Sequence, residues 1–184
     1  QVPLGLTAGN ALEVRESVEV LAGGGPPDVV ELTLALAREM LDLAGIDADP
    51  AAALADGRAM DSWRRMISAQ GGDPDAPLAE APHVELVPAP ATGRLRRLDA
   101  RAVGIAAWRL GAGRARKEDP VSASAGIVLR AKPGDEVVAG APLIELHTED
   151  PGRIAAAVEA LDGAVEIGDA APDRPPLVID RVRS

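Results

Sequence analysis

Apolar residues recur at helical spacing through the first 72 residues of the chain. A helix is predicted over 11–21, where apolar positions lie three and four residues apart and acidic residues fall between them. A second predicted helix, 26–44, begins with two prolines, which the first turn tolerates, and is apolar nearly all round. We therefore expect that helix to be buried on most sides in a larger assembly. A third helix is predicted to begin at Asp49, and a fourth, ending near Gly71, has one apolar face: Met60, Trp63 and Ile67.

The pattern changes after residue 72. Five prolines between 73 and 91 argue against a helix or a central strand, so we interpret this stretch as an extended connector. Beyond it, Asp99 predicts the cap of a helix over 100–110, and Asp150 predicts the start of another. Short apolar runs between turn residues predict strands at 126–131, 136–138, 143–147, 165–167 and 177–182. The predicted organisation is a helical region, 1–72, a proline-rich connector, 73–91, and a mixed α and β region, 92–184.

The composition narrows the range of functions. The 184 residues carry a formal net charge of -10 and only 1% aromatic side chains, whereas single-stranded nucleic acids bind to aromatic platforms and positive charge. We therefore expect no nucleic-acid partner. No apolar run approaches the roughly 18 residues that a membrane span needs, and the chain contains no cysteine, which suits a reducing compartment. We expect a cytoplasmic protein with no membrane partner.

The sequence contains no evident catalytic constellation. His83 and His147 lie far apart and match no metal-ligand spacing, so we assign no catalytic residue. The stretch 111–114, Gly-Ala-Gly-Arg, follows a predicted helix instead of opening one, which favours a helix-ending loop over a phosphate-binding loop. Eight of the 19 Lys and Arg residues lie between Arg94 and Lys117. This basic segment either faces an acidic surface or an anionic substrate, or it forms a solvated surface.

The segment 4–10 combines a glycine-spaced turn with the start of a helix that carries Glu16. Main-chain carbonyls in such a turn, together with one carboxylate from the helix, form an oxygen ligand set suited to a hard cation. A glutamate on a helix is also a common solvated surface residue. The residues alone leave both interpretations of Glu16 open.

Two groups of residues resemble one known family. Pro3-Leu4-Gly5, followed by Gly9-Asn10-Ala11-Leu12-Glu13-Val14-Arg15-Glu16, is similar to a segment midway along thymidine and pyrimidine-nucleoside phosphorylases. The C-terminal domain of the same family resembles Leu110 to Asp119, then Gly126-Ile127-Val128-Leu129, Pro133-Gly134-Asp135 and Gly140-Ala141-Pro142-Leu143. Both matches occur in the family's order, and the resemblance covers nearly the whole chain.

The resemblance implies a pentosyltransferase of pyrimidine salvage. Such an enzyme reversibly cleaves thymidine, deoxyuridine or uridine with phosphate as co-substrate, and gives the free base and a pentose 1-phosphate. The implied architecture is a homodimer with an α/β (α+β) fold, in which a helical layer of the large α/β domain precedes a C-terminal α+β hammerhead-like domain. The family's phosphate-gripping and base-contacting residues lie upstream of the matched segment. The chain, which starts with Gln1 instead of Met, is therefore expected to be a fragment that is inactive alone.

One family site carries over onto this sequence. The family's monovalent cation, potassium, is held by two main-chain carbonyls and a glutamate, which correspond here to Leu4, Thr7 and Glu16. Thr7 stands where a small apolar residue is common, but a carbonyl ligand depends on backbone conformation more than on the side chain. The resemblance implies that this cation braces the phosphate-binding loop.

Two other functions are alternatives. Residues 132–142 also resemble half of a lipoyl or biotinyl carrier module, although Lys132 and Lys117 lack the Met or Asp neighbours that flank a modified lysine. A non-catalytic structural or interaction domain is the other alternative.

Overall fold

The computed structural model describes residues 2–173 and 176–182, and it divides into two compact units. The sheet unit comprises 1–15 and 78–173, and the helical unit comprises 16–77 and 174–184. Residues 1–15 join the sheet unit because their strand pairs with a strand of the C-terminal half. The domain limits expected from the sequence, 1–72, 73–91 and 92–184, stay a prediction. No helix in the described ranges is long and apolar enough to span a membrane.

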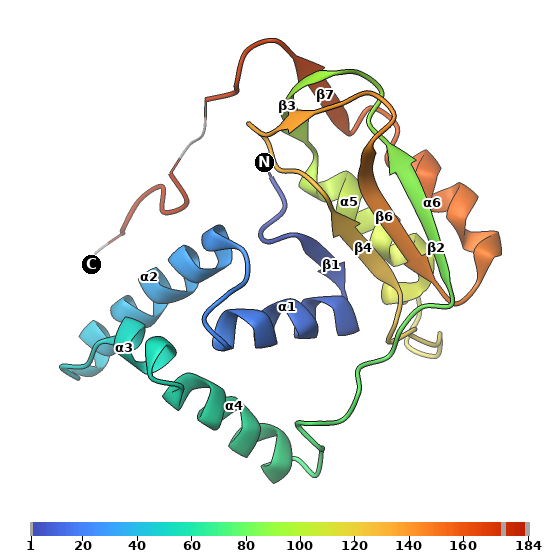
Figure 1. Cartoon of the computed structure of the whole chain (residues 1–184). Helices are drawn as coiled ribbons and strands as arrows, with labels where there is room; N and C mark the ends of the chain where they lie inside the picture. The colour runs from blue at the N-terminus through green and yellow to red at the C-terminus, as the bar shows by residue number, and fades with distance from the viewer. Residues whose placement is uncertain (1, 174–175, 183–184) are drawn as a thin grey trace. The chain divides into compact units, whose positions relative to one another are not determined.

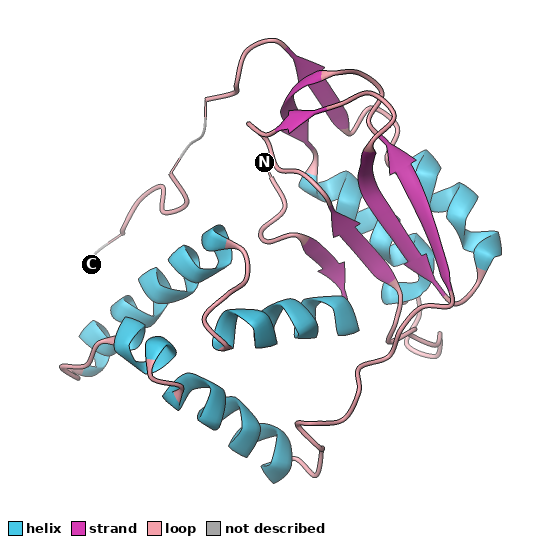
Figure 2. Ribbon diagram, in the orientation of Figure 1, coloured by secondary structure: helices cyan, strands magenta, loops and turns pink. Residues whose placement is uncertain are grey.

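The helical unit contains the helices that the sequence predicts (Figure 2). Helix α1, Ala11–Leu21, begins in the sheet unit and continues into this one, and α2, Pro27–Ala44, ends at Gly45, which has a φ of 65°. Asp49 caps α3, Pro50–Ala55, because its side chain accepts a hydrogen bond from the N–H of Ala51 at 3.0 Å. Helix α4 spans Arg58–Ala69.

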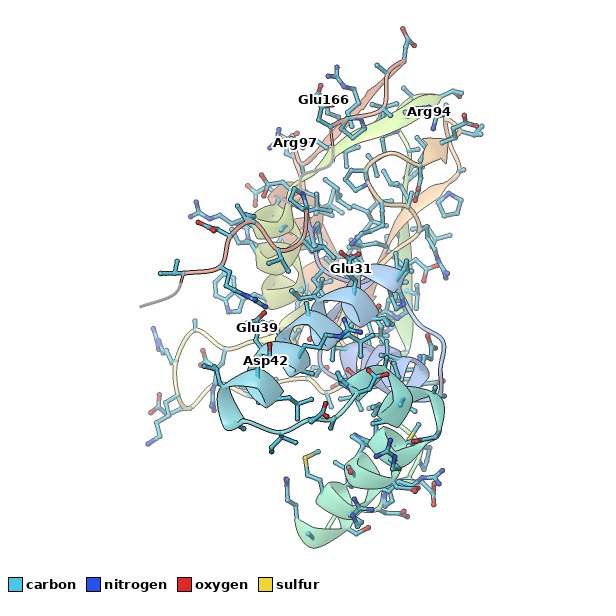
Figure 3. All side chains as sticks on the ribbon, turned by 90° about the vertical axis from the view of Figure 1, so that its left-hand side faces the viewer. Glu31, Glu39, Asp42, Arg94, Arg97 and Glu166 are labelled. Atoms are coloured by element: carbon cyan, nitrogen blue, oxygen red, sulfur yellow. The ribbon has the colours of Figure 1, made fainter. Side chains whose placement is uncertain are left out.

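The helical unit lacks a core of its own around α2, α3 and α4, which contain no fully buried residue. Met40 and Leu43 on α2 are 69% and 89% exposed. The acidic side of α2 carries Glu31, Glu39 and Asp42 (Figure 3), and Glu39 forms an ion pair with Arg181. That α2 is buried in a larger assembly stays a prediction.

The sheet unit is built from two small antiparallel sheets (Figure 1). The four-stranded sheet has the order β1-β4-β6-β2, and the three-stranded sheet has the order β5-β3-β7. The strands are short and are joined by tight turns. In the turn 132–135, which the Pro-Gly pair predicts, Gly134 has a φ of 99°. The strands are β1 Thr7–Gly9, β2 His83–Pro88, β3 Gly93–Leu98, β4 Gly126–Leu129, β5 Glu136–Val137, β6 Pro142–Thr148 and β7 Val165–Gly168.

Helices α5, Ala100–Ala107, and α6, Ile154–Ala160, pack with the sheets around one apolar core. The Asp99 side chain accepts a hydrogen bond from the N–H of Ala102 at 3.0 Å, as the predicted cap requires. A π-helical turn, Trp108–Ala112, continues α5 to Gly111, where the predicted helix ends. The largest fully buried side chains include Leu98, Leu110, Ile127, Leu129 and Leu146. The predicted α+β architecture is confirmed.

The structure contains one strand that the sequence did not predict and lacks one that it did. The connector 73–91 contains strand β2, which pairs with β6 over six residues, because its prolines lie at the strand's end or outside it and an edge strand tolerates them. The strand predicted over 177–182 is absent, and Ile179 and Val182 are 85% and 92% exposed there. A run of apolar residues forms a strand only where a partner strand meets it.

Candidate functional site

β1 is the edge strand that positions the predicted cation ligand Thr7. The N–H of Leu129 donates to the carbonyl of Leu6 at 2.7 Å, and this bond sets the antiparallel alternation of β1 against β4. In that alternation the neighbouring residue, Thr7, directs its N–H and carbonyl away from β4. Because β1 ends the strand order, the Thr7 carbonyl faces the open edge of the sheet.

The side chain of Thr7 has an unusual environment. Leu6 and Ala8 pack against the core, so the side chain between them lies on the opposite face of the sheet. Its Oγ1 atom is buried, and none of the described residues offers it a hydrogen bond. The resemblance to the family implies a role only for the carbonyl of Thr7. No sequence signal reveals the hydroxyl, because the burial of one atom depends on the fold around it.

The turn that carries Leu4 is held by Lys132. The Lys132 ammonium donates to the carbonyls of Pro3 and Gly5, the second at 2.7 Å, although the two segments lie 127 residues apart. The N–H of Lys132 in turn donates to Asp135 Oδ2 at 2.8 Å, which fixes the backbone of the lysine. An ammonium bound to two carbonyls is poorly suited to the swinging arm of a carrier module.

The three predicted cation ligands do not lie in one unit. Leu4 and Thr7 belong to the sheet unit, whereas Glu16 is half-buried on α1 within the helical unit. At the edge of β1, the carboxylate present is that of Glu13, whose Oε1 accepts the N–H of Gly9 at 2.7 Å. Across residues 2–173 and 176–182, no three His, Asp or Glu side chains cluster in a way that would hold a metal.

A polar network with no signal in the sequence anchors the loop after the π-helical turn. Asn10 Nδ2 donates to the carbonyls of Ala112 and Ser122, at 2.9 and 2.8 Å. The hydroxyls of Ser122 and Ser124 donate to Glu149 Oε1, at 2.7 and 2.8 Å. These two hydrogen bonds, that of Ser122 first, hold the pKa of Glu149 below its usual range.

Replacing Glu149 with glutamine is expected to remove part of the acid sensitivity of the protein. Because folding lowers the pKa of this carboxyl, the serine hydrogen bonds contribute stability above its unfolded-state pKa, and that contribution is lost as pH falls through the lowered value. The melting temperature of Glu149→Gln should be lower than that of the native protein at neutral pH, and the difference should shrink in acid. Glu85→Gln, at an exposed position on β2, is the control. If the difference in melting temperature between the native protein and Glu149→Gln does not change with pH, the serine hydrogen bonds do not lower the pKa of Glu149.

Half of the eight basic residues in the segment 94–117 form ion pairs on the surface. Four of its arginines have carboxylate partners, at N–O distances of 2.7, 3.4, 3.0 and 2.8 Å: Arg94 with Glu136, Arg96 with Glu166, Arg97 with Asp99 and Arg109 with Glu159. Figure 3 shows three of these side chains, Arg94, Arg97 and Glu166, on β3 and β7. Such exposed pairs contribute little stability, but they neutralise the positive potential. The solvated-surface interpretation is therefore favoured.

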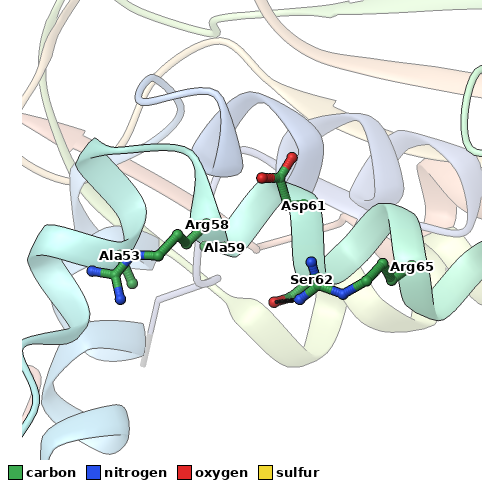
Figure 4. A pocket seen from close by; sticks show the side chains of 6 residues that line it. All are labelled: Ala53, Arg58, Ala59, Asp61, Ser62 and Arg65. Carbon is green, nitrogen blue, oxygen red and sulfur yellow. Dashed lines mark hydrogen bonds between the residues drawn. The ribbon is translucent and has the colours of Figure 1, made fainter.

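Neither the two histidines nor the cavity along α3 and α4 shows a catalytic arrangement of side chains. His83 pairs with Thr148 in the sheet and His147 with Val84, so the two imidazoles lie on opposite faces of neighbouring strands. A cavity of about 400 Å³ lies along α3 and α4 (Figure 4). Its cations are engaged locally, because Arg58 Nε donates to Asp56 at 2.8 Å and Arg65 donates to Ser62 Oγ at 2.8 Å.

Comparison with known proteins gives a consistent result. Residues 94–168 match the family model of the pyrimidine nucleoside phosphorylase C-terminal domain. The chain is 55% identical over 181 residues to a thymidine phosphorylase of Mycobacterium tuberculosis, a match that covers 98% of this chain and 42% of that protein. It is 41% identical over 157 residues to the pyrimidine-nucleoside phosphorylase of Bacillus subtilis, covering 79% of this chain and 36% of the relative. A thymidine phosphorylase of Burkholderia cenocepacia is 37% identical over 189 residues, with 95% and 43% coverage. The chain thus spans less than half the length of these relatives.

Proposed function

The chain belongs to the thymidine and pyrimidine-nucleoside phosphorylase family, and from this we propose that the full-length protein is a pentosyltransferase that phosphorolyses thymidine and related pyrimidine nucleosides. In this reaction a phosphate oxygen bonds to C1′ of the sugar while the C1′–N bond breaks. The base then leaves, and the sugar becomes a pentose 1-phosphate. The observation that carries the proposal is the 55% identity to a thymidine phosphorylase over 98% of this chain.

The proposed role of this chain within the enzyme is that of a scaffold. Its imidazoles lie on opposite faces of a sheet, and many of its arginines are already paired with carboxylates. The carrier alternative is disfavoured by the engaged ammonium of Lys132. We infer that the groups that bind phosphate and base lie upstream of the segment matched by this chain.

The assembly and location belong to the proposal as well. The resemblance to the family supports a homodimer that closes around its substrates. The location expected from the sequence, the cytoplasm, stays a prediction.

Purified full-length protein tests the proposal when it is incubated with inorganic phosphate and each of three nucleosides: thymidine, deoxyuridine and uridine. We expect free base from thymidine, since thymidine phosphorylases are among the relatives. The 184-residue chain alone is the matched control, and we expect it to release no base. Base release by the chain alone contradicts the scaffold role, whereas its absence from the full-length reaction contradicts the proposed function.

We also propose a potassium site that uses the main-chain carbonyls of Leu4 and Thr7 and the carboxylate of Glu16. All are oxygen donors, as a hard cation requires. The carbonyl of Thr7 faces the open edge of β1, and the buried Oγ1 of the same residue lacks a protein partner within the described chain. These features fit a cation. When bound, the ion would supply a positive charge that braces the loop holding the phosphate.

A further inference from the structure

Thr7 offers two oxygen atoms of different kinds near the edge of the four-stranded sheet. Its Oγ1 is the one buried side-chain nitrogen or oxygen that lacks a hydrogen-bond partner in the described part of the chain. Its main-chain carbonyl points away from β4, as the bond from Leu129 to Leu6 dictates. Buried polar groups are nearly always satisfied in folded proteins. We therefore expect this hydroxyl to bind a group other than the described residues of the chain.

A monovalent cation has the chemistry of such a partner. The hydroxyl and the carbonyl of one threonine are both neutral oxygen acceptors, and both are of the hard-donor type that alkali and alkaline-earth cations accept. The two atoms belong to one residue, so ordering them around an ion costs little additional conformational entropy in a paired strand. A hydrogen-bonding group of the protein is the competing partner for the hydroxyl, and the two partners differ in whether the stability of the protein depends on potassium.

The charge near this edge favours a cation. Glu13 Oε1 accepts the N–H of Gly9, which is two residues from Thr7 and points toward the same open edge. The ammonium of Lys132 is already engaged by the carbonyls of Pro3 and Gly5. The positive charge of Lys132 therefore lies at the preceding turn, whereas the charge beside the strand that carries Thr7 is the carboxylate of Glu13.

We infer that the side-chain hydroxyl of Thr7 is a ligand of the potassium ion, in addition to the carbonyl of the same residue. The inference rests on the proposed cation site and deepens it, because that site otherwise uses Thr7 only through its backbone. Thr7 is then a determinant of cation affinity through its side chain. A valine, which has nearly the same shape, removes only the hydroxyl.

The test compares the native full-length protein with Thr7→Val, Thr7→Ser and Thr33→Val. Thr33 lies on α2, outside the proposed cation site, and controls for the same chemical change. Melting temperature is followed against KCl at constant ionic strength, with choline chloride as the replacement salt, and KCl binding is measured by calorimetry. We expect Thr7→Val to raise the half-saturating KCl concentration by about tenfold or more, a size typical of damage to a metal site. Thr7→Ser should retain most of the response, and Thr33→Val all of it.

In choline chloride the order of stability should reverse. Thr7→Val should then match or exceed the native protein, because valine suits a strand and leaves no unpaired hydroxyl. An equal loss of stability in both salts would mean that Oγ1 bonds to a protein group, and an unchanged half-saturating KCl concentration in Thr7→Val would show that it is no ligand; either result overturns the inference.

Parallel phosphorolysis assays separate this inference from the proposed function. A native protein that cleaves thymidine but shows no stabilisation by KCl refutes the cation site and the inference, and leaves the function intact. A protein that cleaves no nucleoside, yet loses its KCl response in Thr7→Val, refutes the function and supports the ligand.

Discussion

Replacing Leu146 with alanine is expected to destabilise the sheet unit by about 2–5 kcal/mol. Leu146 is 0% exposed on β6, which lies between β4 and β2 in the four-stranded sheet. Its removal loses apolar contacts and leaves a cavity in the core, because tightly packed neighbours relax only in part. Urea unfolding monitored by circular dichroism measures the loss as a lower transition midpoint.

Leu86→Ala is the matched control for this variant. Leu86 lies on the adjacent edge strand β2 and is 48% exposed, so the same truncation should cost only about 1 kcal/mol. A Leu146→Ala variant no less stable than Leu86→Ala would mean that the core is not centred on β6.

Replacing Gly126 with alanine is expected to detach β1 from β4. A Cβ atom at Gly126 would lie 2.5 Å from the carbonyl oxygen of Ala8 and 3.1 Å from Cα of Gly9, and both are backbone atoms that cannot turn aside. Overpacking of this kind costs about 1–3 kcal/mol, and more where backbone must move. Hydrogen exchange should show lost protection in β1 while α5 stays protected. The potassium response should weaken too, because β1 positions Thr7.

Gly104→Ala is the control for the glycine substitution. Gly104 lies in α5, and a Cβ atom there would meet nothing within 4 Å. Since alanine is favoured over glycine in helices by about 1 kcal/mol, this variant should be as stable as the native protein or slightly more stable. Equal exchange rates for β1 in Gly126→Ala and Gly104→Ala would contradict the predicted steric clash.

Local signals in the sequence predict most of the elements of this fold. Asp49 and Asp99 are predicted as helix caps and accept the expected backbone hydrogen bonds. Such caps can be predicted from a single sequence because the donor and the acceptor lie two or three residues apart. Local sequence does not predict the edge strand β2 or the absence of a strand at 177–182, because a strand depends on a partner distant in the sequence.

At the candidate site, too, the contacts between residues distant in the sequence could not be predicted. The resemblance identifies Thr7 and Glu16 as ligands, but only the structure shows that the Thr7 hydroxyl is buried without a partner and that Glu16 falls in the other unit. The contact of Lys132 with the turn at Gly5 and the serine bonds to Glu149 join segments distant in sequence. Contacts of this kind leave no pattern of residue spacing in a single sequence, so they cannot be predicted from it.

The central claim, that the full-length protein is a phosphorylase of pyrimidine nucleosides, is tested most directly by its product balance. Thymidine is incubated with the full-length protein in the presence and in the absence of inorganic phosphate, and free thymine and deoxyribose 1-phosphate are both quantified. A phosphorylase is expected to form the two products in equal amounts, and only when phosphate is present. Thymine formed without phosphate, or accompanied by free deoxyribose in place of the phosphate ester, would contradict it.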